Sequence, residues 1–97
     1  MLEIDEHIGK VKDFPIKGIL FYDICPLLAD PEAFEDACSR LEHEIQRIGD
    51  VQKIVAVDAR GFVFGAAVAR SLKLPLILSR KKGKLPGETI SVEYKLE

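Results

Sequence analysis

The sequence lacks most of the features that mark membrane, metal-binding or disulfide-rich proteins. No apolar run approaches the roughly 20 residues that a membrane-spanning helix needs. The N-terminal segment is acidic and mixed in character, unlike a signal peptide. The two cysteines have no CxxC spacing and the two histidines form no cluster, which argues against a structural zinc site and indicates a reducing cytoplasm. The sequence also contains no internal repeat and no low-complexity tract.

The sequence has no excess of positive charge. Its formal net charge is -2, whereas a general nucleic-acid binder is usually strongly basic. With 47% hydrophobic and 31% charged residues, the composition is that of an ordinary folded domain, and 97 residues suffice for one small domain. Positive charge is instead concentrated locally, which favours a small anionic ligand over a nucleic acid or a membrane.

The first half of the chain, residues 1–50, predicts a helical segment. The spacing of apolar residues predicts a short helix over 3–12, followed by a turn over 13–18. The apolar run 19–22 is too short for its period to distinguish a strand from an extended loop. A longer helix is predicted over 31–48, with Asp30 as its N-cap, Gly49 as its stop and an apolar stripe formed by Phe34, Cys38, Leu41, Ile45 and Ile48.

The second half, residues 51–97, predicts a parallel α/β unit. Residues 53–57 form a β-branched apolar run that is typical of a strand covered on both faces. A turn over 58–61 leads into a buried helix over 62–72, and 76–78 is a second buried strand. This order predicts a βαβ crossover. Residues 88–97 alternate in polarity, which predicts a half-exposed terminal strand.

The turn Asp58-Ala59-Arg60-Gly61 is the first candidate site. Ligands of parallel sheets bind beyond the carboxyl ends of the strands, where a helix start offers free N–H groups. Gly61 allows a phosphate to approach the backbone, and Arg60 adds a forked pair of donors. The alternative is an ordinary tight turn with a surface arginine, and the spacing alone does not decide between the two.

The run Arg80-Lys81-Lys82-Gly83-Lys84 is the second candidate. It follows a predicted strand, so it begins at the same sheet edge as Arg60, and its four cations create a positive field suited to a polyphosphate. The alternative is a solvated charged loop, which is the commoner fate of such runs. The shaped turn Leu85-Pro86-Gly87 that follows favours the binding interpretation.

Two weaker candidates lie elsewhere. Adjacent aromatics in Leu20-Phe21-Tyr22 could stack on a planar base, although composition favours Phe21 as core with Tyr22 covering it. Glu97 could act as a general acid or base, although an exposed structural glutamate is the commoner situation.

Taken together, these segments resemble the adenine branch of the type I phosphoribosyltransferases. The resemblance covers essentially the whole chain, and its most specific part is the tandem of the last two segments. The matching segments are 13–15, 18–24, 26–28 with 30–31, 57–62 with 64–65, and 80–87. It implies an α/β fold with an incomplete parallel-sheet phosphoribosyltransferase core, an N-terminal helical segment and a C-terminal strand, all within one partial domain.

The resemblance also implies an activity and roles for the candidate residues. The family transfers ribose 5-phosphate from phosphoribosyl pyrophosphate to adenine, giving AMP and pyrophosphate with magnesium, and the likeness suggests a homodimer. The backbone around Leu20, Phe21 and Tyr22 would frame adenine, and Glu97 falls where the family has its acid/base carboxylate. Pyrophosphate would be held by Ala59, Arg60 and Gly61. Further positive charge, which could reach across a dimer interface, would come from Arg80, Lys81 and Lys84.

The sequence departs from the family in two respects. Tyr22 stands where the family commonly has arginine. The donor-binding signature, a strand ending in paired acids before a Thr/Gly-rich loop, has no match, because Glu35-Asp36 lies inside a predicted helix. We therefore expect a partial chain that is inactive alone. The alternatives are a non-catalytic nucleotide- or pyrophosphate-binding protein and an oligomerising fragment with an unfinished sheet edge.

Overall fold

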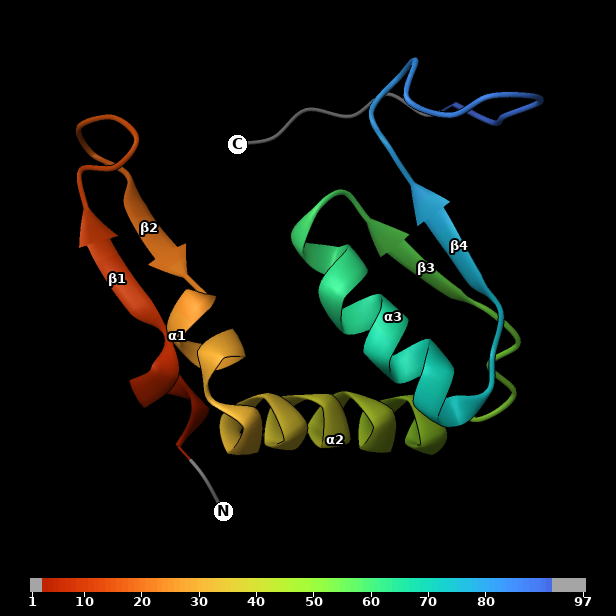
Figure 1. Cartoon of the computed structure of the whole chain (residues 1–97), viewed down its shortest axis with the longest axis horizontal. Helices are drawn as coiled ribbons and strands as arrows, with labels where there is room; N and C mark the ends of the chain where they lie inside the picture. Colours follow the sequence, from red (N-terminus) through yellow and green to blue (C-terminus); the bar gives the residue numbers. More distant parts are fainter. Residues whose placement is uncertain (1–2, 92–97) are drawn as a thin grey trace. The chain divides into compact units, whose positions relative to one another are not determined.

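The computed structural model describes residues 3–91, and the chain divides after Asp50 into two compact units, unit 1 before this point and unit 2 after it. Figure 1 shows the elements of both units in chain order. Within residues 3–91, no helix is long and apolar enough to cross a membrane.

Unit 1 begins with a short turn of helix and a β-hairpin. The 3-10 helix η1 spans Ile4–His7, and strand β1 (Gly9–Lys12) pairs antiparallel with β2 (Leu20–Asp23). The hairpin loop is closed by a hydrogen bond from the Phe14 N–H to the Ile19 carbonyl, at 3.1 Å. Residues 19–22, for which the sequence left strand and loop open, are thus largely strand.

The predicted helix over 3–12 is wrong, because its second half is strand β1. Glycine is a poor helix former, and Gly9 faces Asp23 across the hairpin, where a Cβ would stand 3.3 Å from the Asp23 Cβ. Pairing with β2 therefore overrides the helical spacing of Ile4, Ile8 and Val11.

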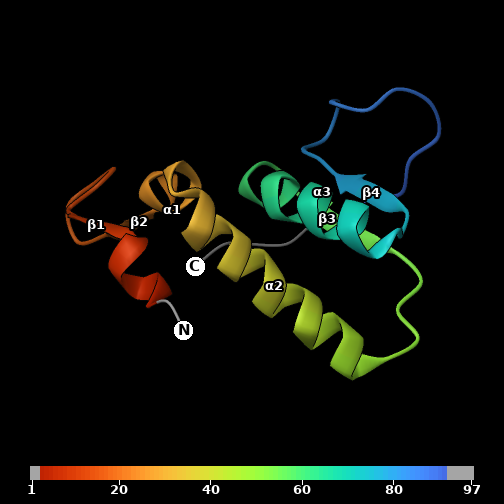
Figure 2. The same ribbon diagram turned by 60° about the horizontal axis from the view of Figure 1, so that its bottom comes forward.

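Two helices follow the hairpin, α1 over Cys25–Ala29 and α2 over Pro31–Ile48, as Figure 2 shows. The sequence did not predict α1, which at five residues is too short for a periodic pattern. The prediction of α2 is confirmed, including its cap: Asp30 Oδ1 accepts hydrogen bonds from the N–H groups of Glu32 and Ala33 at 3.0 and 3.2 Å.

The apolar stripe of α2 is only partly buried. Cys38 is buried, as is Ala33, which the stripe did not include, but Leu41 and Ile48 are 43% and 70% exposed. Within unit 1, α2 contacts η1 and α1. These are short elements, and they bury only part of an 18-residue helix.

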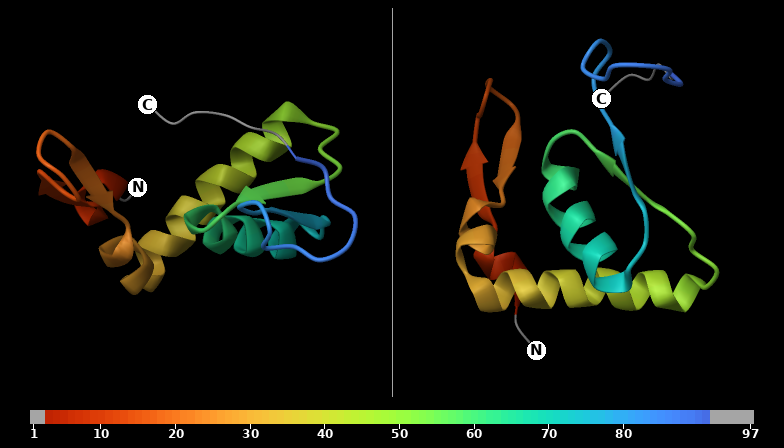
Figure 3. Two further views of the ribbon diagram at one scale, coloured as in Figure 1. Left: turned by 90° about the horizontal axis from the view of Figure 1, so that it is seen from above. Right: turned by 45° about the vertical axis from the view of Figure 1, so that its right-hand side comes forward.

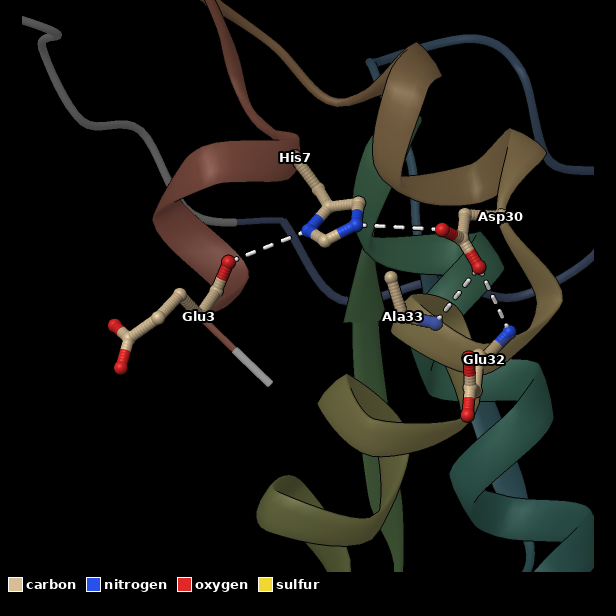
Figure 4. Close-up of polar contacts among 5 residues, drawn as sticks. All are labelled: Glu3, His7, Asp30, Glu32 and Ala33. Atoms are coloured by element: carbon tan, nitrogen blue, oxygen red, sulfur yellow. Dashed lines mark hydrogen bonds and ion pairs between the residues drawn. The ribbon is translucent and has the colours of Figure 1, made fainter. Parts of the chain in front are cut away.

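The side chain of Asp30 also joins η1 to α2 (Figure 4). His7 Nε2 lies 3.3 Å from Asp30 Oδ2, and His7 Nδ1 lies 3.2 Å from the carbonyl oxygen of Glu3. The side chain of His7 is 25% exposed, so this histidine is partly buried between η1 and the start of α2.

Unit 2 is the predicted βαβ crossover. Strands β3 (Ile54–Val57) and β4 (Leu76–Ser79) pair in parallel, joined by helix α3 (Arg60–Leu72), which lies along one face of the strands (Figures 1 and 3). The core of this unit is small and tightly packed, and it consists of Ala56, Gly65, Val68 and Ala69.

A close approach of α3 to β3 requires glycine at one position. A Cβ at Gly65 would stand 2.6 Å from the Cβ of Ala56, a separation that real Cβ atoms do not tolerate. Gly65 therefore sets the distance between helix and sheet, and so the position of the first turn of α3.

The predictions that β3 is covered on both faces and that β4 is buried are wrong for the described residues. Val55 and Val57, which alternate with the buried Ala56, are 62% and 51% exposed, and every residue of β4 is exposed. The reason is that α3 packs on one face of the two-stranded sheet only. Of the predicted terminal strand, residues 88–91 are irregular, and the rest lies outside the described residues.

Candidate functional site: the carboxyl edge of the parallel sheet

The parallel pairing of β3 and β4 brings two predicted site segments to one sheet edge. Val57 pairs with Ser79, and the ladder continues with a 2.9 Å hydrogen bond from the Asp58 N–H to the Ser79 carbonyl. The turn after β3 and the basic run after β4 therefore start side by side. This juxtaposition confirms the shared edge that the sequence predicted for Arg60 and Arg80.

The turn after β3 delivers backbone N–H groups at a helix start. Ala59 occupies the N-cap position of α3, which begins at Arg60, two residues earlier than predicted. No side chain caps this end of the helix, and Arg60 is exposed. The first N–H groups of a helix carry partial positive charge. An anion beyond the sheet edge is the natural partner for them.

Gly61 has space beside it. A Cβ at this position would meet only ordinary contacts, at 3.8 Å from Ala56 and Val57. Packing within unit 2 therefore does not require a glycine here, in contrast to Gly65. A glycine that packing does not require is suited to close approach of a ligand to the backbone.

Arg80 is tied to the turn from the other strand. Its Nε donates to Asp58 Oδ2 at 3.4 Å, and its guanidinium carbon lies 5.8 Å from the centre of the Phe62 ring. Asp58 belonged to the predicted motif without a role of its own, and Phe62 was assigned to the helix core. The signal that could have found the pair is its opposite charges at the ends of adjacent parallel strands.

The rest of the basic run forms a turn. The N–H of Lys84 donates to the carbonyl of Lys81 at 3.1 Å, and Gly83 has a φ of 86°, which favours glycine. Lys81 and Lys84 are both exposed. Their side chains thus add solvent-exposed positive charge in the segment that follows Arg80.

The predicted base-binding residues lie on β2 in unit 1. Phe21 is half-buried and packs edge-on against Phe14, with ring centres 5.1 Å apart. Leu20 and Tyr22 alternate to the other face of the strand and are 47% and 53% exposed. The two adjacent aromatics therefore do not form one stacking surface, and Phe21 has the packing role that composition favoured.

The two cysteines are free thiols in different surroundings. The N–H of Cys25 donates to Asp23 Oδ1 at 2.9 Å. This bond and one from the thiol lower the pKa of Asp23, and the same carboxylate raises the pKa of the Cys25 thiol. Burial raises the pKa of Cys38. Neither thiol is therefore activated as a nucleophile, and only Cys38 is buried in the packing of unit 1.

Glu97 lies outside the described residues. Within residues 3–91, no group of three or more histidine, cysteine, aspartate or glutamate side chains is arranged to hold a metal ion.

Solved structures with this arrangement are known. Adenine phosphoribosyltransferase from Thermoanaerobacter pseudethanolicus superposes with a TM-score of 0.88 at 43% identity, covering 95% of this chain and 54% of that one. The enzyme from Saccharomyces cerevisiae, complexed with an imino-altritol bisphosphate and adenine, superposes with a TM-score of 0.83 at 31% identity, covering 88% and 52%. The chain thus has the phosphoribosyltransferase fold over the part that it covers.

Sequence comparison finds relatives of the chain within the phosphoribosyltransferases. The chain is 50% identical over 95 residues to adenine phosphoribosyltransferase from Mycoplasma mobile, which covers 98% of this chain and 54% of the relative. No family model matches the chain. In sequence and fold, the chain is similar to the adenine phosphoribosyltransferases over the part that it covers, and it spans about half the length of the curated relatives it matches.

Proposed function

We propose that the chain forms the adenine- and pyrophosphate-binding part of an enzyme that transfers ribose 5-phosphate from phosphoribosyl pyrophosphate to adenine. The products are AMP and pyrophosphate, so the reaction is one of purine salvage. The observation that carries this proposal is the convergence of the Asp58–Gly61 turn and Arg80 at one sheet edge. The names of the relatives support the reaction, and the adenine in the yeast structure supports the base.

The residues at the sheet edge would act on the leaving group. Transfer builds positive charge on the sugar and negative charge on the departing pyrophosphate. The N–H groups of Ala59, Arg60 and Gly61, together with the side chains of Arg60 and Arg80, would stabilise that negative charge without reorganising during the reaction. Lys81 and Lys84 would draw the donor to the edge through their longer-range field.

The remaining assignments follow the resemblance. The backbone of Leu20, Phe21 and Tyr22 would frame adenine, and Glu97 would manage the proton of the base. Tyr22 stands where the family usually has arginine, so the segment that would frame adenine has one cation fewer. By the resemblance, magnesium would accompany the donor's phosphates, where its charge would help to neutralise the leaving pyrophosphate. Residues 3–91 contain no group of three or more acidic, histidine or cysteine side chains arranged to hold it. A homodimer and a cytoplasmic location complete the proposal, the latter supported by the two free thiols.

A chimera tests this function directly. The chain replaces the matching 54% of the Mycoplasma mobile enzyme, and AMP formation from adenine and phosphoribosyl pyrophosphate is measured. We expect turnover, and we expect Arg60→Ala to raise the KM for the donor. Arg70→Ala, at the other end of the same helix, is the matched control and should change nothing. A folded chimera that makes no AMP, or one in which Arg60→Ala has ordinary kinetics, contradicts the proposal.

A further inference from the structure

The guanidinium of Arg80 is held on two sides by residues of other elements. Asp58, at the end of β3, accepts from Nε at 3.4 Å, and the ring of Phe62, in the first turn of α3, lies 5.8 Å from the guanidinium carbon. The Asp58 side chain is 17% exposed and that of Arg80 35%. Arg80 itself follows β4, so these contacts tie together all three elements that meet at the sheet edge.

These contacts engage only part of the guanidinium. A guanidinium is a planar fork of N–H donors that suits the oxygens of a phosphate. Asp58 takes the Nε–H, and Phe62 restrains the flat face. Together, the contacts with Asp58 and Phe62 fix the orientation of the two terminal amino groups of Arg80. An arginine with its side chain already ordered loses less conformational freedom when it binds an anion.

The negative charge of Asp58 works against the anion binding that an ordered Arg80 favours. A carboxylate beside an anion site repels the anion, so its presence at the edge calls for a compensating role. Orienting Arg80 is such a role, since the pair is formed by neighbouring strand ends and Asp58 is the less exposed partner.

We propose that Asp58 and Phe62 are positioning residues that hold Arg80 ready to donate to pyrophosphate at the Asp58–Gly61 turn. This inference rests on the proposed function and adds to it two residues that work through a third. It implies that Asp58 promotes pyrophosphate binding through its hydrogen-bond acceptor rather than through its charge.

Two substitutions separate the acceptor from the charge. Asp58→Asn keeps a side-chain oxygen and removes the charge, whereas Asp58→Ala removes both. Both variants remove the repulsion between Asp58 and pyrophosphate. The difference between their affinities therefore isolates the contribution of the side-chain oxygen that accepts the hydrogen bond. In calorimetric titrations with pyrophosphate, we expect Asp58→Asn to bind about threefold more tightly than Asp58→Ala, the scale of one partly exposed hydrogen bond. Equal affinities of these two variants overturn the inference.

An Arg80→Ala background shows whether the acceptor acts through Arg80. In that background the difference between Asp58→Asn and Asp58→Ala should vanish, because the residue being positioned is gone. A difference that persists indicates a role in the fold of the turn and overturns the inference. Phe62→Leu keeps an apolar side chain but removes the ring, and it should weaken binding only when Arg80 is present.

A measurement without ligand completes the test. In the intact chain, the Nε–H of Arg80 should exchange with solvent more slowly than that of the exposed Arg70, and Asp58→Ala should abolish the protection. Equal exchange of the two arginines overturns the inference. If the intact chain fails to bind pyrophosphate, the proposed function fails and the inference with it. If the intact chain binds but the Asp58 variants agree, the inference alone fails.

Discussion

Asp30 contacts two elements of unit 1 with its two carboxylate oxygens. Oδ1 caps α2, and Oδ2 lies 3.3 Å from Nε2 of His7 in η1. Replacing Asp30 by alanine should lower the free energy of unfolding by about 1 kcal/mol, the usual value of an N-cap. Asparagine caps a helix as well as aspartate, so Asp30→Asn should keep most of this stability. Urea unfolding followed by circular dichroism measures both, and an Asp30→Ala chain as stable as the original contradicts the assignment.

The carboxylate of Asp23 should slow the reactions of the neighbouring thiol of Cys25. Because it raises the pKa of Cys25, less thiolate is present at a given pH, and alkylation should be slow although the residue is exposed. In Asp23→Asn, Cys25 should react faster at pH 8. Cys38 is the internal control, since it is buried and should react only on unfolding. Mass spectrometry of iodoacetamide-treated chains reads both sites, and equal rates in the two proteins contradict the contact.

Asp23 also predicts a dependence of stability on acid. Its folded pKa is lowered below 3.8, chiefly by the N–H of Cys25. Its contribution is therefore complete above the unfolded pKa and is lost as pH falls through the folded value. The stability difference between the original chain and Asp23→Ala should be constant near neutral pH and shrink below about pH 4. A difference that grows in acid contradicts this sign.

Gly61 and Gly65 form a matched pair on one helix. Alanine at Gly65 meets Ala56 at 2.6 Å and should destabilise unit 2 by about 1–3 kcal/mol, despite its better helix propensity. Alanine at Gly61 meets only ordinary contacts and should leave stability unchanged, but it should weaken pyrophosphate binding. Thermal unfolding and calorimetry separate the two effects. If Gly61→Ala is the more destabilising, the helix approach is misassigned.

The second half of the chain was the more predictable. Residues close in the sequence indicate each element of the crossover: the β-branched run at 53–57, the turn and the small-residue helix. Both strands and the helix are therefore predicted near their observed bounds. Helix α2 was predicted for a similar reason, since Asp30, Pro31 and Gly49 act within a few residues of its ends.

Features that depend on distant partners were missed. Whether residues 9–12 form helix or strand depends on Asp23 and Tyr22, which pair with them across the hairpin. The exposure of Val55 and Val57 depends on what covers the sheet, which local sequence does not report. The contact of His7 with Asp30 joins residues 23 positions apart, and composition and spacing give no sign of it. The contact of Arg80 with Asp58 spans 22 positions, and only the parallel pairing of the two predicted strands could have indicated it.

The most direct test of the pyrophosphate site is a titration of the isotope-labelled chain with pyrophosphate, followed by nuclear magnetic resonance. We expect saturable shifts of the backbone amides of Ala59, Arg60 and Gly61 together with the Arg80 Nε–H. A sodium chloride titration at the same ionic strength is the control, and it should leave these signals unmoved. Shifts confined to the exposed lysines, or equal shifts in both titrations, contradict a pyrophosphate site at the carboxyl edge of the sheet.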